Sequence, residues 1–169
     1  MKFLSINFLF IFAASAFADA PLPAPKTYRT CNTYISVCAY SEVDQDTTLY
    51  SVEGEFQLAE LYKINGWHRS LFIAPKGAYV VVGYSGLNLV SKSVTKEEVM
   101  LKIYKKGKLF RKYTLGQIFN NLNSLKATTS HYHWGHIKYV GFREIELETP
   151  EGSVFIELNT GKVYLPTES

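Results

Sequence analysis

The feature of this sequence that most restricts its fold is a regular alternation of short strand-forming runs with turn-forming residues. Runs of β-branched and aromatic residues are separated by Gly, Pro, Asn and Asp at intervals of about 8 to 12 residues. In the clearest run, 143–149, Ile145 and Leu147 point to one face and the intervening glutamates to the other. This pattern predicts a mainly β domain whose strands have one buried and one solvated face.

Glycine-containing turns predict which strands are joined as hairpins. Turns at 150–152 and 159–162 should connect three C-terminal strands into a meander. The same strand, turn, strand unit recurs upstream, with predicted strands at 67–74 and 78–84 and at 99–104 and 108–114. These hairpins resemble the outer hairpins of propeller blades, but the chain is too short for four blades of about 40 residues each. We therefore expect antiparallel hairpins and meanders that form a sandwich or a partial-propeller-like domain.

One segment departs from the strand pattern. Apolar residues recur at helical spacing within 114–125, at Leu115, Ile118, Phe119 and Leu122. Thr114 precedes them and is a suitable N-cap. One short helix is predicted there.

The N-terminus has the organisation of a secretory signal. Lys2 is followed by the almost wholly apolar stretch 4–17, which ends in the small residues of Ala16-Phe17-Ala18. We predict a signal peptide at residues 1–18. A membrane anchor is the alternative, but a bilayer span needs about 20 apolar residues and this run is shorter. The sequence thus predicts a periplasmic or secreted protein with no stable membrane insertion after signal removal.

The remaining chain has the size of one domain. Removing 18 of the 169 residues leaves 151, enough for a single core. Residues 19–30 contain three closely spaced prolines and should form an extended leader, followed by one β-rich domain at 31–169. With Lys2 removed, the net charge falls from +3 to +2. So small a basic excess argues against nucleic acid as a partner.

Two cysteines in an exported chain predict one disulfide, between Cys31 and Cys38. A straight strand would separate their Cα atoms by about 23 Å, whereas a disulfide needs them within about 7 Å. The bridge therefore requires the chain to reverse between them, near Asn32-Thr33. Two buried free thiols are the alternative.

A histidine cluster is the strongest candidate for metal chemistry. On a strand, His131 and His133 project from the same face, and His136 follows closely as a possible third ligand. Such a set suits zinc or copper. Alternatively, Tyr132 and Trp134 are core aromatics and the histidines are half-exposed polar residues bonded to loop backbone.

Aromatic residues make up 15% of the chain, and twelve residues are tyrosines. Their amphipathic rings suit both binding faces and small β cores. The binding interpretation predicts an aromatic platform for a glycan or a protein, with an Asn from the 83–89 loop beside it. Its members would be Trp67, His68, Tyr84, Asn88, Tyr132 and Trp134.

Catalysis has weak support in the sequence. Ser85 lies outside a Gly-x-Ser-x-Gly elbow, and adjacency alone does not aim the Ser130 hydroxyl at the imidazole of His131. The glutamates of 143–149 share one wet face, unlike an acid and base held in contrasting environments. We expect a protein that is not an enzyme, with a hydrolase as a further alternative.

Three motifs are similar to those of a group of small exported bacterial proteins of unknown function. They are Cys31-Asn-Thr-Tyr-Ile-Ser-Val-Cys38-Ala39, Gly83-Tyr-Ser-Gly-Leu-Asn-Leu89 and Thr129-Ser-His-Tyr-His-Trp-Gly135. The resemblance implies export and a β-rich fold, and it implies no activity or cofactor. The leading hypothesis is thus a non-catalytic binding or structural protein of the bacterial envelope or exterior. A metal-binding protein is the second.

Overall fold

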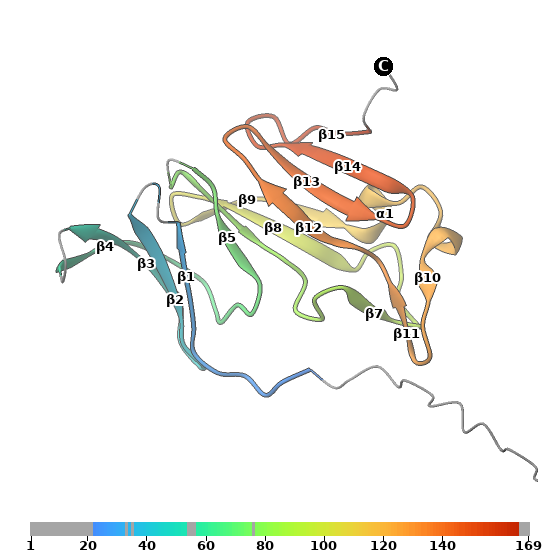
Figure 1. The fold of residues 1–169 in the computed structure, drawn as a ribbon, viewed down its shortest axis with the longest axis horizontal. Coiled ribbons are helices and arrows are strands. Elements are labelled where there is room, and N and C mark those ends of the chain that lie inside the picture. Colours follow the sequence, from blue (N-terminus) through green and yellow to red (C-terminus); the bar gives the residue numbers. More distant parts are fainter. Residues whose placement is uncertain (1–21, 33, 35, 54–56, 76, 166–169) are drawn as a thin grey trace, which may run out of the picture.

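The computed structural model describes residues 22–32, 34, 36–53, 57–75 and 77–165. The predicted signal peptide, 1–18, lies outside the described residues. Residues 22–27 have no regular secondary structure, and the first strand begins at Tyr28, three residues before the predicted start of the domain at Cys31. The chain is mainly β, as predicted, and its strands form four antiparallel sheets (Figure 1).

Sheet A is an N-terminal meander in the order β1-β2-β3-β4. Its strands are β1 (Tyr28–Asn32), β2 (Val37–Ser41), β3 (Thr47–Glu53) and β4 (Gln57–Ile64). Cys31 and Cys38 face each other in the β1–β2 register and form a disulfide, with Cα atoms 4.0 Å apart. The predicted chain reversal is therefore confirmed.

Sheet B has the order β5-β6-β8-β9. Its strands are β5 (Leu71–Ile73), β6 (Tyr79–Val82), β8 (Val99–Lys105) and β9 (Lys108–Thr114). Both predicted hairpins are confirmed by the β5–β6 and β8–β9 pairings. The predicted strand at 67–74 starts only at Leu71, because the preceding loop is bonded to sheet A.

Two further sheets complete the fold. Sheet C combines β10 (Lys126–Ala127), β11 (His131–His133) and β7 (Leu89–Ser91). Sheet D is a meander of β12 (His136–Val140), β13 (Glu144–Thr149), β14 (Gly152–Glu157) and β15 (Val163–Tyr164). The predicted three-stranded C-terminal meander is confirmed as β13, β14 and β15, and β12 joins it as a fourth strand.

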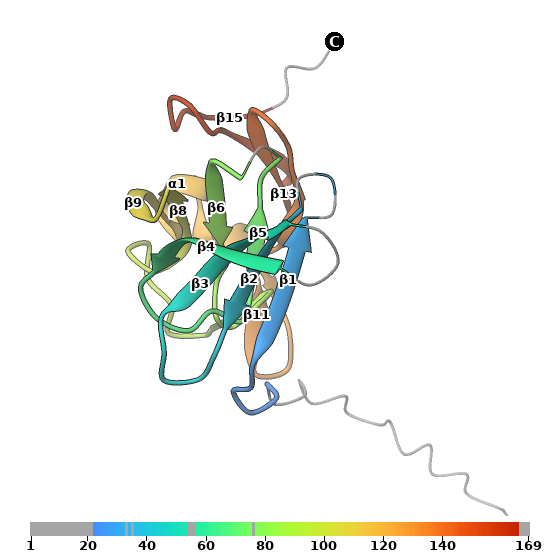
Figure 2. The ribbon, with the colours of Figure 1, turned by 90° about the vertical axis from the view of Figure 1, so that its left-hand side faces the viewer.

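Sheet B is the middle layer of the molecule. Along β6, Tyr79 and Val81 join a core shared with sheet D, while Val80 and Val82 join a core shared with sheet A. The alternation of side chains along a strand explains why this apolar run is buried on both faces. Figure 2 shows sheet A in front of sheet B.

The predicted helix is shorter than its apolar spacing indicated. α1 (Leu115–Ile118) is a single turn, and a 3-10 turn, η1 (Leu122–Ser124), follows it. Thr114 is the N-cap as predicted, and its N–H donates to Gln117 Oε1 at 2.9 Å. Phe119 has an extended conformation and ends the helix. Within the described residues, neither helix has the length and apolar character needed to cross a membrane.

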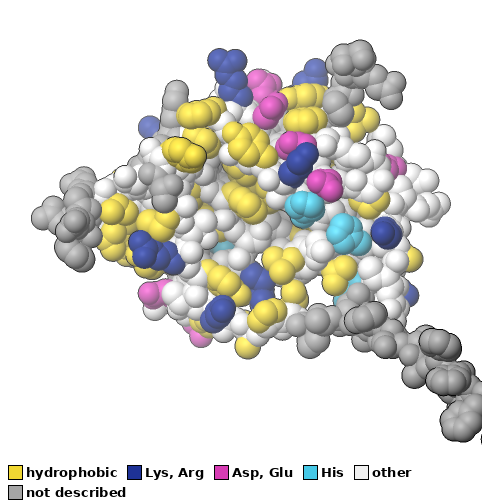
Figure 3. All heavy atoms as spheres, in the orientation of Figure 1, with side chains coloured by type: hydrophobic (Ala, Val, Ile, Leu, Met, Phe, Trp, Pro, Cys, Tyr) yellow, Lys and Arg dark blue, Asp and Glu magenta, His cyan; other side chains and the backbone are white. Residues whose placement is uncertain are grey.

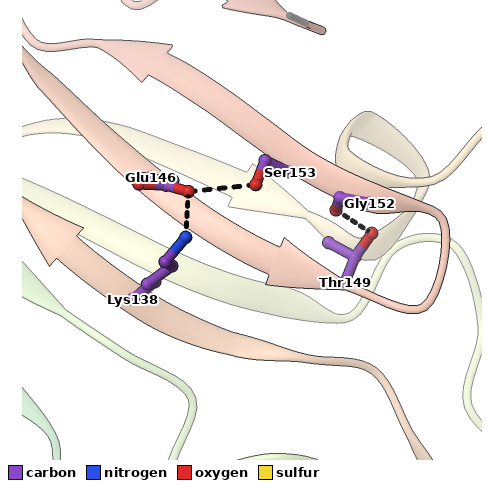
Figure 4. A network of polar contacts seen from close by, with 5 residues as sticks. All are labelled: Lys138, Glu146, Thr149, Gly152 and Ser153. Carbon is purple, nitrogen blue, oxygen red and sulfur yellow. Dashed lines mark hydrogen bonds and ion pairs between the residues drawn. The ribbon is translucent and has the colours of Figure 1, made fainter.

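The outer face of sheet D is tied together by polar contacts. Lys138 donates to Glu146 Oε1 at 2.8 Å, and Ser153 donates to the same oxygen at 3.0 Å, so that one carboxylate joins β12, β13 and β14 (Figure 4). At the β13–β14 turn, Thr149 Oγ1 donates to the Gly152 carbonyl at 2.7 Å. The glutamates of β13 thus face solvent, as predicted, while Ile145 and Leu147 are buried.

Candidate functional site

The loop between β4 and β5 carries Trp67 and His68 and is attached to sheet A by buried polar groups. Thr47 Oγ1 lies 2.8 Å from the Gly66 carbonyl and 2.9 Å from Ser41 Oγ. The backbone N–H of His68 donates to Ser41 Oγ. Because Ser41 and Thr47 are buried, these bonds fix the loop in place.

The loop after β6 carries Tyr84 and is held by Trp134. Trp134 is only 1% exposed, and its indole Nε1 donates to the Leu87 carbonyl at 2.7 Å. Its backbone N–H donates to the Asn88 carbonyl at 3.0 Å. The Tyr84 ring packs against Gly86, where an added Cβ would lie 2.5 Å from Cε1 of that ring. The glycine therefore sets the position of the tyrosine.

These two loops and the start of β8 enclose a cavity of about 450 Å³, which we call the polar pocket. The side chains that can contribute chemistry to it are those of Trp67, His68, Tyr84, Glu98 and Lys102. They come from segments far apart in the sequence, which the stacking of sheets A and B brings together.

The surroundings of His68 disfavour its charged form. Burial lowers the pKa of its imidazole, and the charge of Lys102 lowers that pKa further. A hydrogen bond with the Asn65 backbone and the charge of Asp46 raise it, but by less. The ring nitrogen Nε2 is buried and has no partner among the described residues.

Glu98 is bound to Tyr84. Burial raises the pKa of the Tyr84 hydroxyl, and the hydrogen bond and charge of the Glu98 carboxylate raise it further. The hydroxyl is therefore protonated at neutral pH and donates to the carboxylate. Lys102 remains as a cationic donor in the wall of the polar pocket.

Another cavity, of about 360 Å³, is also lined by Tyr84, and we call it the apolar pocket. It shares Gly83 and Tyr84 with the polar pocket. Its lining consists of Ser70, Phe72, Gly83, Tyr84, Leu87, Asn88, Trp134, His136 and Ile137. Tyr84 thus belongs to the walls of both pockets.

The predicted aromatic platform is divided between the two pockets. The polar pocket has Trp67 and His68, the apolar pocket has Asn88 and Trp134, and Tyr84 belongs to both. Tyr132 lines neither pocket and packs, half-buried, against the main core. Sequence reasoning missed Lys102 of β8 and Glu98, which directly precedes that strand, since both look like ordinary surface charges near a hairpin.

The three histidines proposed as metal ligands lie on two consecutive strands. His131 and His133 lie on β11 and His136 begins β12. Burial and the charges of His136 and Lys126 lower the pKa of His133, while Glu148 raises it. Histidine, acidic and basic side chains lie together on the face shown in Figure 3. The described residues include no group of three or more His, Cys, Asp or Glu that could hold a metal ion. Metal binding by these histidines remains a prediction.

Serine nucleophiles were also assessed by geometry. Ser85 lines the polar pocket with His68, but no hydrogen bond joins the serine to the unpartnered Nε2. Contrary to expectation, the Ser130 hydroxyl does lie 2.9 Å from Nδ1 of His131, because the tight turn before β11 brings adjacent side chains together. That pair is exposed and lines neither pocket.

The two pockets around Tyr84 are therefore the strongest candidate site on the described part of the chain. Comparisons of the chain with protein-family models, curated proteins and solved structures found no match.

Proposed function

We propose that this chain is an exported, non-catalytic binding protein of the bacterial envelope or exterior, and that it holds a glycan in the two pockets around Tyr84. The observation that supports this proposal is the position of Tyr84 between a polar pocket and an apolar pocket. A ligand that spans both must have a hydrogen-bonding part and a less polar part.

A glycan fits the chemistry of these walls. The polar pocket has a cationic donor in Lys102 and the imidazole of His68 in its wall. A sugar hydroxyl both donates and accepts, so neighbouring hydroxyls can satisfy both groups. The aromatic ring of Tyr84 and the apolar pocket suit the C–H faces of sugar rings and N-acetyl methyl groups. Both volumes lie within the range of about 300–1,000 Å³ usual for small-ligand sites.

The two tryptophans of the chain allow each pocket to be monitored separately. Trp67 lines the polar pocket and Trp134 lines the apolar pocket. In the Trp134→Phe variant, intrinsic fluorescence reports on the polar pocket alone, and in Trp67→Phe it reports on the apolar pocket alone. Titration of both variants with neutral, N-acetylated and acidic oligosaccharides should identify a glycan that changes both signals with one apparent Kd.

Two variants at the shared wall provide the critical comparison. Tyr84→Ala removes the ring, and Gly86→Ala displaces it by introducing a Cβ 2.5 Å from that ring. Each should weaken binding at least tenfold. Tyr34→Ala is a matched control, because Tyr34 is 96% exposed and lines neither pocket. Equal affinity in Tyr84→Ala and Tyr34→Ala, or no response to any glycan, would contradict the proposal and leave a protein partner as the next candidate.

A further inference from the structure

The leader preceding β1 has a conformation set by its prolines. Pro23 and Pro25 fix φ near −65°, and each proline forces the residue before it, Leu22 or Ala24, out of the helical region. These restrictions favour polyproline II for the segment 22–25, which is a left-handed helix with three residues per turn. In the structure, residues 22–27 are exposed and have no strand partner.

Two side chains of the β4–β5 loop bind the backbone of this leader. The indole Nε1 of Trp67 donates to the Lys26 carbonyl at 2.8 Å. A guanidinium nitrogen of Arg69 donates to the Pro23 carbonyl at 2.7 Å. The two acceptors are three residues apart, and in polyproline II that spacing places them on the same side of the helix. The donors thus match the helical repeat of the segment that they hold.

The donors pack against aromatic rings. The Arg69 guanidinium carbon lies 5.3 Å from the centre of the Trp67 ring. The centre of the Tyr28 ring lies 5.8 Å from the centre of the Trp67 ring, and the two ring planes are tilted by 50°. Nε and Nη1 of Arg69 are buried, so the guanidinium meets the leader through its other terminal nitrogen. Aromatic rings beside a hydrogen-bond donor are the usual means by which proteins recognise polyproline II peptides.

From these contacts we propose that Tyr28, Trp67 and Arg69 form a recognition site for proline-rich peptides in the polyproline II conformation, occupied in this structure by the chain's own leader. The leader is bound by side chains alone, with no ladder of backbone hydrogen bonds, and a peptide from another protein displaces it. This site goes beyond the glycan pockets, although Trp67 contributes to both.

The proposal is tested with the whole protein and a labelled peptide of the leader sequence, Leu-Pro-Ala-Pro-Lys-Thr (residues 22–27). The unchanged protein is compared with Pro23→Gly/Pro25→Gly, which keeps both carbonyl acceptors but loses the polyproline II restriction. In the unchanged protein the leader occupies the site, and only the fraction of molecules with a free site can bind the added peptide. The variant should therefore bind the peptide at least fivefold more tightly in fluorescence polarisation. A peptide with both prolines replaced by glycine should bind at least fivefold more weakly.

Variants of the donors complete the test. In the Pro23→Gly/Pro25→Gly background, Trp67→Phe removes the indole N–H and should weaken peptide binding about fivefold, the equivalent of one hydrogen bond. Arg69→Gln is a second donor variant, which serves if Trp67→Phe perturbs the loop. Circular dichroism checks the fold of both variants. Equal binding of the proline and glycine peptides, or unchanged binding in both donor variants, would overturn the proposal. The unchanged protein could also be a dimer while the Pro23→Gly/Pro25→Gly variant is a monomer. That result would support the site, with the leader of a second copy bound in it.

Discussion

Replacing Cys31 and Cys38 together by alanine removes the cross-link between β1 and β2 and only one sulfur atom from each side chain. The bridge joins residues seven apart in sequence and closes a loop of eight residues. In the chain-entropy model, such a loop lowers the entropy of the unfolded chain by about 8.3 cal/mol/K, or about 2.5 kcal/mol at 25 °C. At about 2.1 cal/mol/K of unfolding entropy per residue, a domain of about 150 residues should lose about 8 °C in Tm.

Urea denaturation with and without reductant measures this contribution. We expect reductant to lower the free energy of unfolding of the unchanged protein by about 2.5 kcal/mol and to leave that of the double variant unchanged. Thiol titration of the denatured protein without reductant should find no free thiol. Two free thiols, or full reduction with no change in the denaturation midpoint, would refute the reasoning.

Three further outcomes follow from the structure. Gly135 has φ +128°, and a Cβ there would lie 2.1 Å from the Glu148 carbonyl oxygen. Gly135→Ala should therefore lower the free energy of unfolding, measured by urea denaturation, by about 4 kcal/mol or more. A Cβ on Gly152, which has φ +111°, would meet nothing within 4 Å, so Gly152→Ala should lower the free energy of unfolding by only about 1 kcal/mol. Equal losses in the two glycine variants would contradict the predicted clash at Gly135. The pKa of His68 in the folded protein is below its ordinary value of 6.5. As pH falls, the unfolded chain therefore binds a proton at His68 before the folded protein does. The free energy of unfolding should then fall as pH drops from 7 through 6.5 toward the folded-state pKa. His68→Gln should flatten this dependence relative to the unchanged protein, and identical profiles of the two proteins would contradict the reasoning. Trp134→Phe should lower stability by about 2 kcal/mol, because it removes the indole donor to the Leu87 carbonyl and shrinks a side chain that is only 1% exposed. An unchanged denaturation midpoint would contradict this reasoning.

Local patterns predicted the strands well, because alternation and turn chemistry act between neighbouring residues. The strand at 143–149 and the hairpins around Gly107 and Gly152 appear where the sequence placed them. Errors occurred where distant groups competed with local preference. Residues 67–70 leave the predicted strand because buried Ser41 and Thr47 bind that loop. The helix at 114–125 ends after one turn at Phe119, which is itself part of the main core.

The candidate site, like the fold, was predicted from the sequence only in part. Trp67, His68, Tyr84, Asn88 and Trp134 were selected from residue type alone, and all five line one or both of the pockets. Residue type did not reveal that these five residues line two separate pockets, or that Tyr132 lines neither of them. The charged groups of β8 were missed, since their role depends on the stacking of two sheets.

The sequence by itself determined most of the strands, the disulfide partners and the extended character of the leader, because each depends on backbone preferences or on the only pairing present. The tertiary structure alone decided that sheet B would be buried on both faces and that Trp67 and Arg69 would meet carbonyls more than forty residues away. These outcomes depend on how sheets pack. Packing is set by the shapes and charges of whole surfaces, which no local pattern contains.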